Sequence, residues 1–136
     1  MPNRLVWRRE PQRAIEREFN RRLDACAIAV TNHAKKLISV EGAGKTGTGK
    51  KAKLIYGANP SRPGEPPHKQ TGRLLGSVAW EAQGLVRRVG TGVPYGRWLE
   101  LGTTFLAPRP WLRRALYEMT AFIRAVMSRP MRKDAA

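Results

Sequence analysis

A segment rich in glycine and lysine, residues 42–51, comes closest to a known catalytic motif. A phosphate-binding loop needs a glycine, four further residues, a Gly-Lys pair and then a hydroxyl residue, because its backbone surrounds the phosphate and the hydroxyl binds magnesium. One register of the segment places Ser39 at the position of the first glycine, and the other places Lys51 at the position of the hydroxyl. Both registers fail by one residue, so we interpret the segment as a flexible basic loop.

Other residue types that could support catalysis or metal binding are few and widely separated. His33 and Cys26 lie at or near the apolar face of a predicted first helix, and His68 lies in a predicted loop. Two distant histidines without a carboxylate cluster do not form a metal site. A thiol on an apolar helix face behaves as a small hydrophobic group. We therefore predict no enzymatic activity, no catalytic residue, no metal and no cofactor.

The tryptophans allow two interpretations. They are Trp7, Trp80, Trp98 and Trp111. In a strongly basic chain they could be stacking platforms for single-stranded nucleic acid. Aromatic side chains in such positions are more often anchors of a core or of a subunit interface, and we favour that interpretation.

Net charge limits the classes of partner. The chain has 136 residues with 26 Lys and Arg against 10 Asp and Glu, a formal net charge of +16. Such a charge calls for nucleic acid, an acidic protein or an anionic membrane surface as counterpart. The basic residues are spread along the chain, so the charge does not locate a site. The length predicts one domain, and no apolar run approaches the roughly 20 residues that span a bilayer, so we expect no membrane partner.

The first half of the chain predicts a long helix followed by a loop. Apolar residues recur at helical spacing from Pro11 to about Ile38. They are Ile15, Phe19, Leu23, Cys26, Val30 and Leu37. Residues 41–70 contain six glycines and four prolines and are predicted to be a flexible basic loop. Residues 1–10 are expected to form an N-terminal arm.

The second half predicts a small sheet and a final helix. Residues 71–91 alternate as a hairpin with a turn at Gln83-Gly84, and residues 95–101 predict a strand or a short helix. Pro110 begins a helix that ends before Pro130, leaving residues 129–136 as a tail. The expected fold class is α+β: a long N-terminal helix, a small antiparallel sheet and a C-terminal helix, with the basic loop between the first helix and the sheet.

Ordered motifs resemble a known family. Residues 95–103 read YGRWLELGT and residues 107–112 read APRPWL, followed by Ala115-Leu116; residues 61–67 read SRPGEPP and residues 71–78 read TGRLLGSV. In this order they resemble the signature of small tail-completion and head–tail joining proteins of tailed bacteriophages, over about residues 10–127. The chain departs from that signature at Gly96, Leu101 and Trp111, where alanine, an aromatic residue and phenylalanine are usual. The basic insert at residues 42–53 is not part of the signature.

The resemblance implies a virion structural protein that acts by ring assembly at the neck or the top of the tail, after assembly in the host cytoplasm. The implied partners are further copies of the chain in a ring of six or twelve, a portal or connector protein, and a tail-tube or tail-terminator protein. We expect the assembly interface to use six residues: Tyr95, Trp98, Glu100, Gly102, Arg109 and Trp111. Four lysines are expected to contact packaged DNA or a partner without sequence specificity: Lys45, Lys50, Lys51 and Lys53.

Two questions stay open at this point. Glu100 is either an exposed residue or one half of an ion pair with an arginine of the same or a neighbouring subunit. The arginines nearest in sequence are Arg97, Arg109 and Arg113, and Glu100→Gln is expected to weaken assembly. The alternative function is a basic nucleic-acid-binding module, which would bind short DNA as a monomer with steep salt dependence.

Overall fold

A computed structural model describes residues 10–40, 42, 44–46, 53–55 and 59–131. Its elements are, in chain order, α1 (Glu10–Leu37), β1 (Gly44–Thr46), β2 (Lys53–Ile55), α2 (Arg73–Ser77), β3 (Val78–Gln83), β4 (Val86–Thr91), α3 (Pro94–Leu101), α4 (Leu112–Glu118) and α5 (Thr120–Met127). The predicted α+β fold is confirmed. Among the described residues, no helix combines the length and the apolar character that crossing a membrane would require.

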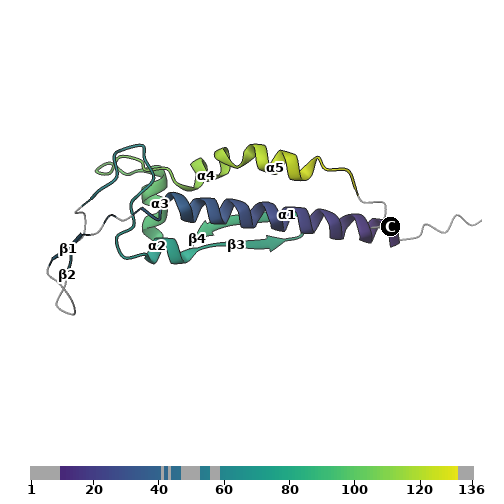
Figure 1. Cartoon of the computed structure of the whole chain (residues 1–136), viewed down its shortest axis with the longest axis horizontal. Helices are drawn as coiled ribbons and strands as arrows, with labels where there is room; N and C mark the ends of the chain where they lie inside the picture. The colour runs from purple at the N-terminus through teal and green to yellow at the C-terminus, as the bar shows by residue number, and fades with distance from the viewer. Residues whose placement is uncertain (1–9, 41, 43, 47–52, 56–58, 132–136) are drawn as a thin grey trace, which may run out of the picture.

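Helix α1 is the central element. It has 28 residues and is therefore about 42 Å long at about 1.5 Å per residue. The β3–β4 hairpin runs along one side of α1 and the α4–α5 segment runs along another (Figure 1). The short helices α2 and α3 lie near the C-terminal end of α1 (Figure 1).

The hairpin agrees with its sequence pattern. Strands β3 and β4 are antiparallel, with Val78 opposite Thr91, and Gly84 takes a positive φ of 57° in the turn. A polar contact fixes β4 on α1, because Arg87 Nε donates to Asp24 Oδ1 at 2.5 Å. The hairpin predicted for residues 71–91 is confirmed from Val78 to Thr91, but its predicted start is wrong, because Arg73–Ser77 form helix α2.

The segment predicted as one long loop, residues 41–70, contains more structure than expected in its described parts. Strands β1 and β2 pair antiparallel, with Gly44 opposite Ile55. Residues 59–70 return to the end of α1, where Lys69 N donates to Val40 O at 2.6 Å. Backbone hydrogen bonds therefore pair two short strands inside this segment and join its last residues to the end of α1. The amino-acid composition gave no sign of these bonds.

The buried face of α1 is displaced by one position from the predicted stripe in its first half. One series of buried positions steps by four along α1 and into the residue after it: Ala14, Glu18, Arg22, Cys26, Val30, Ala34 and Ile38. Ala27 and Thr31, beside this series, are also buried. Ile15 and Phe19, which were predicted to face the core, are 48% and 38% exposed. Glu18 and Arg22 take the inward positions because they bond to each other, at 2.9 Å between Arg22 Nε and Glu18 Oε1.

The hydrophobic core lies toward the C-terminal end of α1. Its buried cluster joins α1, α2, β3 and the start of α4 through Ala34, Ile38, Leu74, Val78, Trp111 and Ala115. The predicted C-terminal helix is confirmed, with a break at Met119 that separates α4 from α5. This core supports the part of the chain that carries the motif residues.

Candidate assembly site

The predicted interface residues lie in residues 93–112, called the corner here, which comprise α3 and the connection to α4. Trp111 is only 1% exposed, and its Nε1 donates to Gly96 O at 3.2 Å. Gly96 is buried beside Thr91, where an added Cβ would lie 2.6 Å from Thr91 Cγ2. Trp111 therefore belongs to the chain's own core, and the prediction that it is an interface anchor is wrong.

Glu100 holds the start of α4. One carboxylate oxygen accepts from Trp111 N at 2.8 Å and Leu112 N at 2.9 Å, and the other accepts from Arg113 N at 2.9 Å. The first turn of a helix has N–H groups without helical partners and carries a partial positive charge, so a carboxylate there is stabilising.

Within one chain, this contact takes the place of the ion pair that was one of the two alternatives for Glu100. Arg113 reaches the carboxylate through its backbone N–H, and among the described residues no Lys or Arg side chain pairs with Glu100. The residue that sequence reasoning treated as an intermolecular contact is a helix cap supplied by a neighbouring helix.

Gly102 and Arg109 shape the connection between α3 and α4. Gly102 ends α3 with a φ of +75°, and an added Cβ would lie 2.9 Å from Leu106 O, so a side chain would be strained there. Arg109 N donates to Leu99 O at 2.7 Å, and its Nη1 donates to the backbone and side-chain oxygens of Ser61. Both residues thus hold the corner together within one chain.

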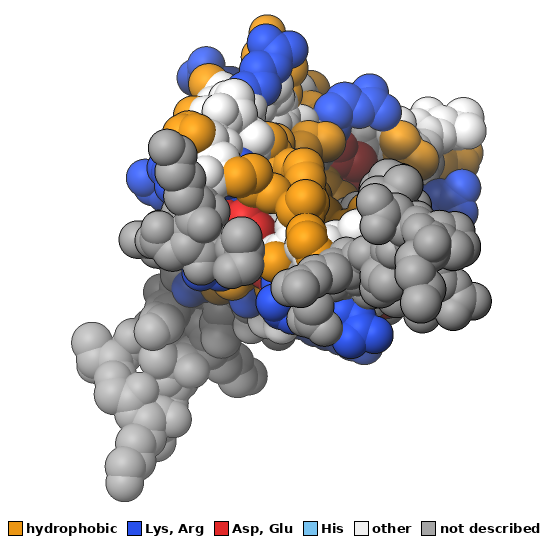
Figure 2. All heavy atoms as spheres, turned by 90° about the vertical axis from the view of Figure 1, so that its right-hand side faces the viewer, with side chains coloured by type: hydrophobic (Ala, Val, Ile, Leu, Met, Phe, Trp, Pro, Cys, Tyr) orange, Lys and Arg blue, Asp and Glu red, His pale blue; other side chains and the backbone are white. Residues whose placement is uncertain are grey.

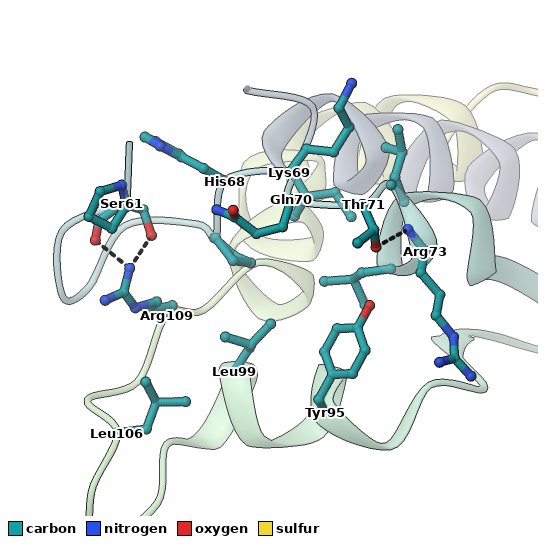
Figure 3. A pocket seen from close by; sticks show the side chains of 16 residues that line it. Ser61, His68, Lys69, Gln70, Thr71, Arg73, Tyr95, Leu99, Leu106 and Arg109 are labelled. Atoms are coloured by element: carbon teal, nitrogen blue, oxygen red, sulfur yellow. Dashed lines mark hydrogen bonds between the residues drawn. The ribbon is translucent and has the colours of Figure 1, made fainter. Parts of the chain in front are cut away.

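A pocket of about 480 Å³ lies between this corner and the segment that contains residues 60–75 (Figure 3). Tyr95 and Leu99 line it from α3, and Arg109 lines it beside Ser61 (Figure 3). Tyr95 is half-buried and packs against the core cluster. Of the six predicted interface residues, five are therefore used at least partly inside the chain.

The sixth, Trp98, is exposed on the corner, as are two apolar residues that follow it within seven positions of the sequence. Trp98 and Leu101 are one helical turn apart on α3 and are each 54% exposed, and Phe105 in the following loop is fully exposed. We call these three residues the outer apolar residues. Phe105 was not predicted as a site residue, although an aromatic residue directly after two threonines in a turn-rich segment was a visible signal.

The opposite end of the molecule combines apolar and basic groups. Viewed from that end, hydrophobic side chains form a central band with Lys and Arg side chains around it (Figure 2). Arg22 lies in this half and was also missed by sequence reasoning. Its guanidinium donates to the backbone oxygens of Met127 at 3.3 Å, Arg129 at 2.6 Å and Pro130 at 3.0 Å, so it holds the chain that follows α5.

Ionisable groups elsewhere in the described chain make structural contacts. Hydrogen bonds from Arg114 and then from His33 lower the pKa of Glu118, and His33 Nε2 lies 2.5 Å from Glu118 Oε2. Burial raises the pKa of the Cys26 thiol, which is a free cysteine. Within the described ranges, no group of His, Cys, Asp and Glu is arranged to hold a metal ion.

The four lysines predicted to contact DNA are only partly placed. Lys45 lies in β1 and Lys53 in β2, where Lys45 is opposite Leu54 and Lys53 is opposite Thr46. Lys50 and Lys51 lie outside the described residues. DNA contact by these lysines stays a prediction.

Comparisons of the chain with protein-family models, with curated proteins and with solved structures gave no match.

Proposed function

We propose that this chain is a virion structural protein that completes a bacteriophage tail or joins tail to head, and that it acts by forming a ring. The motif resemblance over residues 61–116 suggests the class of protein. The observation that carries the mechanism is the exposure of the outer apolar residues, Trp98, Leu101 and Phe105, on a corner braced from within.

The bracing matters because a rigid surface loses little conformational freedom when it binds. Glu100 joins α3 to the start of α4, and the Arg109–Ser61 contact joins the corner to the preceding segment. Gly64 N also donates to Pro108 O at 2.9 Å, which gives a second connection to that segment. In this proposal the inward-facing motif residues hold the corner in shape, and the outer apolar residues, two of which belong to the same motif, make the intermolecular contact.

The outer apolar residues have the character of an interface. Aromatic side chains are enriched among the residues that dominate binding energy, and exposed apolar surface on a small domain often marks an interaction site. A ring requires a contact that joins two different surfaces of the subunit and closes after a fixed number of copies.

Mass photometry of the full chain over a range of concentrations tests the proposal. We expect the unmodified protein to form one closed species of six or twelve subunits. The triple variant Trp98→Ser, Leu101→Ser, Phe105→Ser should remain monomeric at the same concentrations, with an unchanged circular dichroism spectrum because these side chains are exposed.

A matched variant removes apolar area elsewhere. Leu85 and Val86 at the hairpin turn are 59% and 52% exposed, so Leu85→Ser with Val86→Ser should assemble normally. Equal assembly of the triple variant and the unmodified protein would contradict the proposal. So would a chain that stays monomeric and binds short DNA with steep salt dependence, because that is the behaviour of a nucleic-acid-binding module.

A further inference from the structure

The pocket between α3 and the preceding segment has an apolar lining. Ile38, Leu74, Leu75 and Leu99 contribute aliphatic side chains to it, and Tyr95 contributes an aromatic ring. Its volume of about 480 Å³ is within the range of about 300–1,000 Å³ typical of ligand sites. One or two apolar side chains of a bound segment would fit in such a space.

The charged residues around the pocket are all basic. Lys69, Arg73 and Arg109 are among its lining residues, and no Asp or Glu is found among the lining residues that the structure describes. In Figure 3, Tyr95 and Leu99 lie between Arg109 on one side and Arg73 on the other. The pocket therefore combines an apolar interior with positive charge on two sides.

Both of these arginines have donor capacity that the described chain does not use. No described carboxylate lies in ion-pair distance of Arg73 or Arg109. The Nε atom of Arg109 is buried and has no hydrogen-bond partner among the described residues. Nη1 of Arg109 donates to Ser61, whereas Nη2 makes no hydrogen bond to the described residues and, unlike Nε, is not buried, so it can donate to an incoming carboxylate.

We propose that this pocket binds an extended, acidic segment of a different protein, with an apolar side chain in the pocket and carboxylates beside Arg73 and Arg109. Charge complementarity excludes a second copy as the preferred occupant, because the chain carries a net charge of +16. Nucleic acid fits less well, because the lining is mainly aliphatic and its two rings, Tyr95 and His68, come from different segments and form no stacking series. The pocket is separate from the outer apolar residues, so this inference holds whether or not the chain forms rings.

Binding of labelled model peptides to the full chain tests the inference by fluorescence anisotropy. The probe is the hexapeptide DDFLDD, and its matched controls are DDSSDD, which lacks the apolar anchor, and KKFLKK, which reverses the charge. We expect DDFLDD to bind and both controls to bind at least about tenfold more weakly, since the site requires charge and apolar contact together. No binding of DDFLDD, or equal binding of the three peptides, would overturn the inference.

Two charge-reversal variants separate the pocket from the general charge of the protein. Arg73 is exposed at the pocket, and Arg124 is exposed on α5 far along the chain. Arg73→Glu should weaken DDFLDD binding about tenfold, and Arg124→Glu, which changes the net charge equally, should weaken it less than about twofold. Equal losses would show non-specific attraction and would overturn the inference.

The position of the peptide is read from backbone amide chemical shifts. Shifts should concentrate at Leu74, Leu75, Tyr95 and Leu99, and a single-stranded oligothymidine of equal charge should not displace the peptide. Shifts dispersed over the basic surface, or full displacement by the oligonucleotide, would contradict a peptide site in this pocket.

Discussion

The two ends of the α4–α5 segment are both held by a single charged side chain, but in different ways. At its start, the Glu100 carboxylate accepts from three backbone N–H groups of residues 111–113. At its end, the Arg22 guanidinium donates to three backbone oxygens of residues 127–130. An anion at the first end and a cation at the last end both oppose the helix dipole, so each charge has the favourable sign.

The difference between the ends lies in what surrounds the charge. Glu100 comes from the adjoining helix and acts with Gly96, Gly102 and Trp111 in a densely packed corner. Arg22 comes from α1, pairs with Glu18 and contacts a chain end that is otherwise exposed. The start of the segment is therefore held by side-chain packing and by the Glu100 contact together, and it can present a surface for assembly. The end of the segment depends mainly on the buried side chain of Arg22.

Removing the Arg22 side chain should have the largest effect on stability. Arg22→Met has a similar volume but leaves three backbone oxygens and Glu18 Oε1 without their donor, although Arg21 still pairs with Glu18 Oε2. We expect the free energy of unfolding to fall by about 3 kcal/mol. Urea unfolding measures this. The neighbouring Arg21 side chain is 66% exposed, so Arg21→Met should cost less than about 1 kcal/mol. Equal losses for the two variants would refute the special role of Arg22.

Adding a side chain at Gly96 should destabilise the start of the α4–α5 segment by a steric clash. Gly96→Ala adds a Cβ that would lie 2.6 Å from Thr91 Cγ2 and 3.0 Å from Leu74 Cδ1. We expect a loss of about 1–3 kcal/mol in urea unfolding.

The same clash can be relieved. Adding Thr91→Ser removes the Cγ2 methyl group and keeps the hydroxyl, which accepts from Val93 N at 3.1 Å. The double variant should regain part of the lost stability. If Gly96→Ala were as stable as the unmodified chain, the inference that residue 96 has no room for a Cβ would be contradicted.

Replacing Glu100 tests how much its negative charge stabilises the start of α4, and we expect a smaller loss of stability than for Gly96→Ala. Glu100→Gln keeps one acceptor oxygen but places an amide N–H₂ group near backbone N–H donors, so we expect a loss of about 1–2 kcal/mol by thermal or urea unfolding. Glu81 is an exposed glutamate on β3, and Glu81→Gln should change stability by less than about 0.5 kcal/mol. Assembly should weaken for Glu100→Gln alone, and a stable, normally assembling variant would contradict the helix-cap account.

Glu118, in the middle of the α4–α5 segment, should have the smallest effect, which is a change in how stability depends on pH. Arg114 and His33 lower the pKa of Glu118 in the folded chain, so its contribution to stability is complete above the usual pKa of a glutamate and is lost as the pH falls through the lowered value. Glu118→Gln should therefore reduce the stability difference between pH about 7 and pH about 3.5. Glu16→Gln, at an exposed position of α1, is the control, and an unchanged pH difference in Glu118→Gln would rule out this contribution.

Features set by neighbouring residues could be predicted from the sequence. The β3–β4 hairpin follows from alternation and a Gln83-Gly84 turn, and the long α1 follows from helical spacing. The short helix α3 was one of two alternatives for its segment. Helix α2 was missed because five residues containing Gly76 give little periodic signal.

Features set by contacts distant in sequence could not be predicted. The Arg22 contacts join residues 105 to 108 positions apart, so nothing near Arg22 indicates why it replaces an apolar residue on the buried face of α1. The cap by Glu100 spans 11 to 13 positions, and no side chain at the start of α4 caps it locally. The motif could not indicate which of its side chains face outward, because that depends on contacts with segments distant in sequence.

The central claim is assembly through Trp98, Leu101 and Phe105, and electron microscopy of the purified full chain tests it most directly. The account predicts closed rings of six or twelve copies, with these three side chains at the boundary between neighbouring subunits in the averaged map. Monomers at every concentration, or rings in which the three side chains face solvent, would contradict it.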